Sequence, residues 1–180
     1  SNLSINSGAG YSHLPSEINN ALNYAGNSNF SLGLTLASNI SDKIDFTISS
    51  NSIFNDNKNT LQSDQNNQYF NQYSRIKVQA TVWKGLVLQT DLSHQYYNGL
   101  TESFDQNYFL WNAAVGYKFL KNNAAEFRLS VFDILQQNNS LTRNATDTYY
   151  EDVQTNVLQR YALLTFTYNI KSYKETKPKN

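Results

Sequence analysis

Apolar and polar residues alternate along most of this chain, and the last alternating stretch is the clearest. Between positions 164 and 170 every second residue is apolar, and Thr165, Thr167 and Asn169 occupy the positions between them. A period of two places successive side chains on opposite faces of a β-strand. The pattern therefore predicts a strand over 158–170 with hydrocarbon on one face and water on the other.

Seven earlier segments repeat the alternation, and each predicts a strand. These segments cover about 3–11, 30–37, 44–54, 69–83, 86–95, 109–119 and 127–131. Together they predict an all-β fold, an antiparallel up-and-down meander of about eight strands that forms a transmembrane β-barrel or a segment of one. Residues 1–170 would form this barrel segment, and residues 171–180 would form a flexible basic tail.

The predicted connections between the strands alternate in length. The long polar connections are 12–28, 55–67, 98–106 and 136–156, and the short ones are 38–42, 84–85 and 121–123. Outer-membrane barrels have tight periplasmic turns and long extracellular loops. The alternation therefore predicts that the long loops share one end of the barrel and that both chain termini lie at the other. Lys84-Gly85 is the strongest local turn signal.

Charged residues inside the predicted strands share the polar face. That face should line the lumen, because a charge that faces lipid at mid-membrane costs roughly 2–4 kcal/mol. The predicted lumen charges are Asp45, Arg75, Lys77, Asp91, Lys118, Glu126 and Arg128. Lys118 with Glu126 and Asp91 with Lys77 are plausible cross-strand pairs. Arg160 is an exception on the apolar face, near the loop end of its strand.

Aromatic residues of the apolar face gather toward the two ends of the predicted strands. Such rings favour the interface between membrane and water. The predicted extracellular rim contains Phe30, Phe54, Phe70, Tyr96, Phe109 and Trp111, and the predicted periplasmic rim contains Phe46, Tyr117, Phe119 and Tyr168. The same rings could fill the core of a soluble β-sandwich, but a sandwich gives no reason for the alternating loop lengths.

Composition narrows the possible chemistry. The 180 residues carry 14 basic and 14 acidic side chains, so no net positive field exists to attract nucleic acid. Cysteine is absent, which excludes disulfides and thiolate metal ligands, and two histidines are too few for a histidine-rich metal site. Because Ser93 and His94 are neighbours in a strand, they point to opposite faces and cannot readily share a proton. We therefore expect no enzymatic activity and no cofactor.

Several stretches of the chain resemble a known family. The segments F-R-L-S-V-F-D-I-L-Q-Q-N-N-S (127–140) and Y-E-D-V-Q-T-N-V-L-Q-R-Y-A-L-L-T-F-T-Y-N-I (150–170) resemble the C-terminal end of TonB-dependent-receptor-like outer-membrane β-barrels. Residues 104–120 and W-K-G at 83–85 fit the same pattern. The resemblance implies a larger parent with further strands and often a plug. It also implies that the barrel-assembly machinery recognises the final strand through Phe166 and Tyr168.

These observations lead to one main hypothesis and two alternatives. The main hypothesis is a non-enzymatic C-terminal barrel segment of a receptor or transporter in the bacterial outer membrane, in contact with the lipid bilayer. The first alternative is a complete small eight-stranded barrel with a structural or adhesive role, whose long loops contact an extracellular ligand. The second is a soluble lipocalin-like barrel that binds an apolar ligand, with the charges on its outside. Because the sequence contains no methionine, we expect a mature product or an excised piece of a longer chain.

Overall fold

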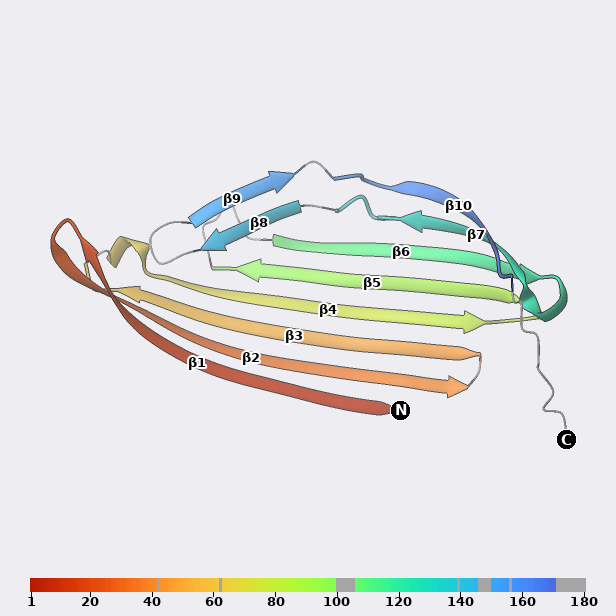
Figure 1. Ribbon diagram of the computed structural model, residues 1–180, viewed down its shortest axis with the longest axis horizontal. Helices are drawn as coiled ribbons and strands as arrows, with labels where there is room; N and C mark the ends of the chain where they lie inside the picture. Colours follow the sequence, from red (N-terminus) through yellow and green to blue (C-terminus); the bar gives the residue numbers. More distant parts are fainter. Residues whose placement is uncertain are drawn as a thin grey trace, which may run out of the picture.

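The computed structural model describes residues 1–41, 43–61, 63–99, 106–138, 140–145, 150–155 and 157–170, and the predicted tail at 171–180 lies outside these ranges. Eight strands form one antiparallel sheet, and two short strands form a separate pair (Figure 1). The sheet contains β1 (Asn2–Ile18), β2 (Ala21–Ser41), β3 (Ile44–Asn59), β4 (Asn67–Thr81), β5 (Leu86–Asn98), β6 (Gln106–Phe119), β7 (Ala125–Phe132) and β10 (Tyr161–Tyr168). The separate pair consists of β8 (Ser140–Ala145) and β9 (Tyr150–Thr155).

The strands of the large sheet follow one another in chain order. Each strand is antiparallel to the one before it, and β10 pairs with β7. This order confirms the predicted up-and-down meander of eight strands. The sheet is open, with β1 and β10 at its two opposite edges (Figure 1).

The connections sort to the two ends of the sheet as the sequence predicts. The short connections β2–β3, β4–β5 and β6–β7 lie at one end, together with the N-terminus and the end of β10 (Figure 1). The β1–β2 turn and the 3-10 helix Ser63–Gln65 lie at the opposite end. We call these the short-turn end and the long-loop end of the sheet.

The first connection differs from the prediction. The expected loop at 12–28 is wrong, because β1 and β2 pair without interruption from Asn2 opposite Ala37 to Ile18 opposite Ala21. Only Asn19 and Asn20 form the turn, with φ angles of 51° and 63°. Asparagine tolerates a positive φ, and positive φ at both central residues is the mark of a tight type I′ hairpin turn. The polar composition predicts a loop, but the backbone hydrogen bonds that pair two strands do not require an apolar face.

Other boundaries also differ from the prediction. The predicted loop at 55–67 begins later, because β3 continues to Asn59. The longest predicted loop, 136–156, contains the β8–β9 hairpin. The final strand is shorter than predicted and covers Tyr161–Tyr168, after which the Asn169 amide still donates to the Ala124 carbonyl oxygen at 2.8 Å.

The turn between β4 and β5 is centred on Lys84 and Gly85, as predicted. The Leu86 amide donates to the Trp83 carbonyl oxygen at 2.8 Å, and the φ angle of Gly85 is 99°. Residues other than glycine rarely adopt this region of φ, because their Cβ atom clashes with the backbone. A Cβ atom at Gly85 would also press against the carbonyl oxygen of Lys118 in the neighbouring strand.

We therefore expect Gly85→Ala to lower the free energy of unfolding by at least about 1 kcal/mol. Urea titration of the protein folded in detergent micelles measures this change. Gly26→Ala is the matched control, because Gly26 lies within β2 and the nearest atoms to a Cβ there are 3.8 Å away. An equal loss of stability in both variants would contradict this account of the turn.

Candidate functional site

The two faces of the sheet differ in chemistry. We call the face that carries Arg75 and Asp91 the polar face, and the opposite one the apolar face. Leu34, Ile48, Ile76, Leu129 and Leu164 are all on the apolar face and are 43%, 43%, 43%, 45% and 70% exposed. So many exposed large apolar side chains on one face of a sheet are rare in proteins surrounded by water. The apolar face therefore requires an apolar environment.

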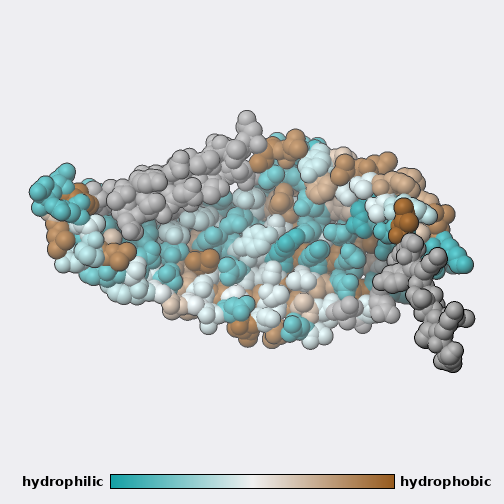
Figure 2. Space-filling view, viewed as in Figure 1, coloured by the Kyte–Doolittle hydropathy of each residue, from teal (hydrophilic) through white to brown (hydrophobic). Residues whose placement is uncertain are grey.

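All seven charged residues predicted for the lumen lie on the polar face. The register places Lys77 opposite Asp91, Lys118 opposite Glu126, and Asp45 opposite Gln79. In Figure 2, hydrophilic side chains occupy the middle of the visible face, and hydrophobic ones gather along its margins. The structure thus brings the predicted charges to one surface, and their role in lining a lumen stays a prediction.

The ion pairs on this face differ from those predicted. Arg75 Nε donates to Asp91 Oδ1 at 2.8 Å, and Arg75 Nη2 donates to Asp91 Oδ2. Arg128 Nη2 lies 2.7 Å from Glu126 Oε1. The two predicted lysine pairs are opposite in the register, but the structure pairs each carboxylate with an arginine. A guanidinium offers a planar fork that can grip both carboxylate oxygens, whereas an ammonium is a single point charge.

A small hollow opens on the polar face beside these pairs. It measures about 130 Å³, and its lining includes Gln89, Asp91, Asn112, Arg128 and Ser130. Arg128 Nη1 donates to Gln89 Oε1 at 2.8 Å, which fixes the guanidinium over the strand. The lining offers both hydrogen-bond donors and acceptors, so this face suits water and polar solutes better than an apolar ligand.

The ten predicted interface aromatics all lie on the apolar face. Phe30, Phe54 and Phe70 are directly opposite one another on adjacent strands, and the Tyr96 ring lies 6.3 Å from that of Phe70. Phe109 and Trp111 continue this group on β6. At the short-turn end, the ring centroids of Tyr117 and Phe119 are 6.3 Å apart. Phe46 and Tyr168 lie on the same face.

A polar cluster within the apolar face was not predicted. Gln72 Nε2 donates to Ser50 Oγ at 2.6 Å and to Ser74 Oγ at 3.1 Å, and Ser52 Oγ donates to Gln72 Oε1. The four side chains satisfy one another, which reduces the cost of placing polar groups on this face. No sequence pattern signals the cluster, because it depends on the register of β3 against β4.

His94 also lies on the apolar face, and Ser93 points to the polar face as predicted. His94 Nε2 is 2.8 Å from Asn107 Oδ1, and its ring stacks on Phe109 with centroids 4.3 Å apart. These contacts are those of a packed surface residue. The described residues contain no group of three or more His, Cys, Asp or Glu that could hold a metal ion.

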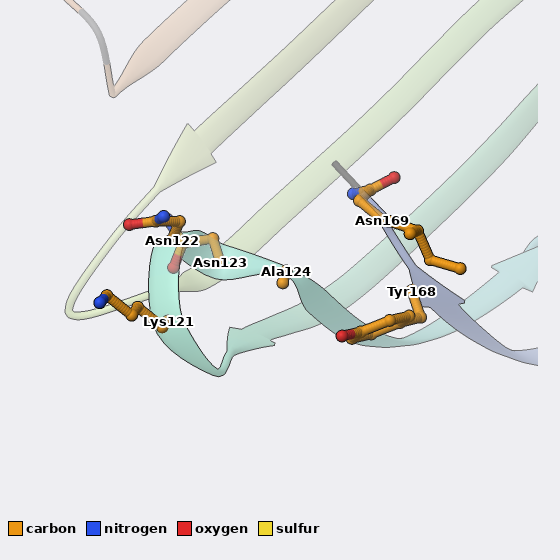
Figure 3. A pocket seen from close by; sticks show the side chains of 7 residues that line it. Lys121, Asn122, Asn123, Ala124, Tyr168 and Asn169 are labelled. Carbon is orange, nitrogen blue, oxygen red and sulfur yellow. The ribbon is translucent and has the colours of Figure 1, made fainter. Parts of the chain in front are cut away.

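Two local features border the connections that lead to and from the last strands. Asp133, 2% exposed, follows β7, and its carboxylate accepts from the amides of Gln137 at 2.9 Å and Asn138 at 3.2 Å. At the short-turn end, the β6–β7 turn meets the end of β10 around Tyr168 and Asn169 (Figure 3). The space between them measures about 340 Å³. The Asp133 contacts order the chain directly after β7, and the β6–β7 turn and the end of β10 border one another at the short-turn end.

These features define the class of protein. An antiparallel meander with one charged face, and one apolar face that carries aromatic groups toward both ends, has the construction of a transmembrane β-barrel. In the described part of the chain, no helix is long and apolar enough to cross a membrane.

Comparison with known proteins identifies the family. A model of the outer membrane protein beta-barrel family matches residues 16–168, so the chain belongs to this family. No curated protein and no solved structure matches significantly. The protein therefore resides in the bacterial outer membrane and contacts its lipid bilayer. The soluble sandwich and the lipocalin-like barrel do not fit this membership.

Proposed function

We propose that this chain is the C-terminal part of the barrel of a TonB-dependent-type receptor or transporter and has no enzymatic activity of its own. The observation that carries the proposal is the open sheet, whose edges are β1 and β10. The resemblance of 127–140 and 150–170 to the C-terminal end of such receptors supports it. In this proposal, the barrel-assembly machinery recognises β10 through Phe166 and Tyr168, which both lie on the apolar face.

The open edges matter because of where the sheet lies. An unpaired N–H or C=O group in the hydrocarbon of a bilayer costs several kcal/mol, so a spanning sheet must close. β1 has 17 residues and β10 has 8, so the two edges are unequal in length. In a larger barrel, further strands pair with both edges, and the polar face lines a wide aqueous interior.

A complete small barrel is the second candidate. The observation in its favour is the number of strands, because eight is the smallest number found in bacterial outer-membrane barrels. In that case β1 would pair with β10, and side chains would fill the interior. Such a protein would have a structural or adhesive role, with ligand contacts made by the long-loop end.

Disulfide cross-linking distinguishes these candidates, and the absence of native cysteine makes each introduced pair unique. Ser4→Cys is combined in turn with Leu163→Cys, Thr165→Cys and Thr167→Cys, because all four positions lie on the polar face. A disulfide requires Cβ atoms about 3.5–4.5 Å apart. We expect no cross-link in the protein purified from outer membranes, since β1 and β10 do not meet.

The positive control is Ser4→Cys with Thr35→Cys, because Ser4 and Thr35 are directly opposite in the β1–β2 register. We expect this control to cross-link. Efficient cross-linking of Ser4→Cys to any of the three β10 variants would establish closure between β1 and β10. That result would overturn the larger barrel in favour of the complete small one.

A further inference from the structure

The first three strands extend well past the aromatic group of Phe30, Phe54 and Phe70. In β2, Tyr24 lies six residues before Phe30 and nearer the long-loop end, which corresponds to about 20 Å along a strand. At this distance the side chains lie beyond the apolar belt, on the side that the long loops identify as extracellular. On this extension, the same face of the sheet carries a hollow of about 330 Å³. Its volume is at the lower end of the roughly 300–1,000 Å³ range of small-ligand sites.

One wall of the hollow is aromatic. The rings of Tyr11 and His13 are 6.4 Å apart with an interplanar angle of 8°, and those of His13 and Tyr24 are 4.9 Å apart with an angle of 2°. Three rings from two strands thus lie in nearly parallel planes. Tyr11 is 72% exposed, so the group does not serve to fill a core. Exposed tyrosines supply large contact areas at low cost in conformational entropy.

The floor and the opposite wall are different. The floor is Gly26 on β2, where a Cβ atom would have His13 Cδ2 as its nearest neighbour at 3.8 Å. The opposite wall comes from β3, where Lys58 Nζ lies 3.1 Å from Asp56 Oδ2. The absence of a side chain at Gly26 therefore leaves the space between the aromatic wall and the charged wall.

A buried asparagine joins β2 to the end of β3 beside the hollow. Asn23 is 0% exposed, and its Oδ1 accepts from Thr60 Oγ1 at 3.2 Å and from the Leu61 amide at 3.0 Å. The Tyr24 amide donates to Thr60 Oγ1 at 2.9 Å. These bonds fix the end of β3 against β2, so the two walls are held in position before any ligand binds.

The chemistry of the walls selects a class of ligand. An aromatic ring packs well against the C–H face of a sugar ring, while the carboxylate accepts and the ammonium donates hydrogen bonds to hydroxyl groups. Because Asp56 and Lys58 neutralise each other, the site favours a neutral ligand. A purely apolar ligand would remove water from this ion pair without replacing its hydrogen bonds.

We propose that this hollow binds a neutral saccharide, with a β-1,4-linked pyranose unit against the aromatic wall. Such a unit presents flat faces of C–H groups, which match the aromatic wall. The equatorial hydroxyls at its edge match the charged wall. The proposal does not rest on transport or on the size of the barrel, because the site lies entirely on β1, β2 and β3 and on Thr60, which follows β3.

The test is a titration of the protein in detergent micelles with cellotriose, β-1,4-xylotriose and chitotriose, followed by saturation-transfer NMR. For a shallow site we expect at least one of them to bind with a dissociation constant on the order of 1 mM. Sorbitol, which has the hydroxyls but no ring face, should not bind. Gly26→Val fills the floor, Tyr11→Ala removes part of the aromatic wall, and each should weaken binding by roughly tenfold or more.

Leu22→Ala is the control, because Leu22 is on the same face of β2, 57% exposed, and outside the lining of the hollow. It should bind as the parent does. Thermal unfolding of each variant establishes that it is folded. If either Gly26→Val or Tyr11→Ala does not fold, the saccharide affinity of the other variant tests the site. Absence of binding by all three saccharides, or unchanged affinity in the folded variants, would overturn the proposal.

Discussion

Leu164→Arg should destabilise the folded protein in a bilayer by roughly 2–4 kcal/mol, and Thr165→Arg at the next position should cost clearly less. Leu164 is 70% exposed on the apolar face, directly opposite Leu129. An arginine there would place its charge against hydrocarbon. Thr165 is opposite Arg128 on the polar face. An arginine there would meet a polar surface, and its cost would come mainly from the like charge of Arg128.

Reversible urea unfolding in lipid vesicles, with both variants compared with the parent protein, measures this difference. The two substitutions introduce the same side chain at adjacent positions of β10, so each serves as the control for the other. If Thr165→Arg proves the more damaging, the assignment of the two faces is inverted.

Asp91→Arg should lower the free energy of unfolding by about 2 kcal/mol. The substitution removes the carboxylate that Arg75 grips through two hydrogen bonds. It also places a third cation beside Arg75 and Lys77, because Lys77 is directly opposite position 91 in the register. The expected loss is moderate, since the Arg75 side chain is 45% exposed and water screens part of the repulsion.

Exchanging the two charges should restore most of this loss. The double variant Arg75→Asp with Asp91→Arg recreates the ion pair in the reverse direction, and unfolding in vesicles measures its recovery. Asp45→Arg is the control, because Asp45 is on the same face but opposite the uncharged Gln79. Equal stabilities of the double variant and Asp91→Arg would show that the pair itself does not stabilise the sheet.

The strands and their faces were predictable because a period of two is a local property of the sequence. The structure keeps the predicted alternation in β4, where Ile76, Val78 and Ala80 lie on one face and Lys77 and Gln79 on the other. The turn at Lys84-Gly85 was predictable for a similar reason, since glycine is the residue that accepts its φ angle. Local rules therefore gave the meander and the side of the sheet on which each charge lies.

Other features depend on partners far away in the chain. Residues 12–28 have the composition of a loop, and they form strands because β1 and β2 pair along their whole length. Asp91 pairs with Arg75 and not with Lys77, which is directly opposite, because the long arginine side chain extends diagonally from β4 to β5. The group of Tyr11, His13 and Tyr24 exists only because the hairpin brings β1 and β2 together. The shared parity of Tyr11 and His13 was the one sequence signal available for it.

The most direct test of the membrane-spanning arrangement is an accessibility scan of β4 in lipid bilayers. Single cysteines at positions 75 to 80 carry a nitroxide spin label, and collisions with oxygen and with a water-soluble nickel chelate are compared by electron paramagnetic resonance. Oxygen concentrates in the bilayer, so labels at 76, 78 and 80 should collide mainly with oxygen, and labels at 75, 77 and 79 with the nickel chelate. An inverted alternation, or none, would contradict an apolar face in lipid and a charged face in water.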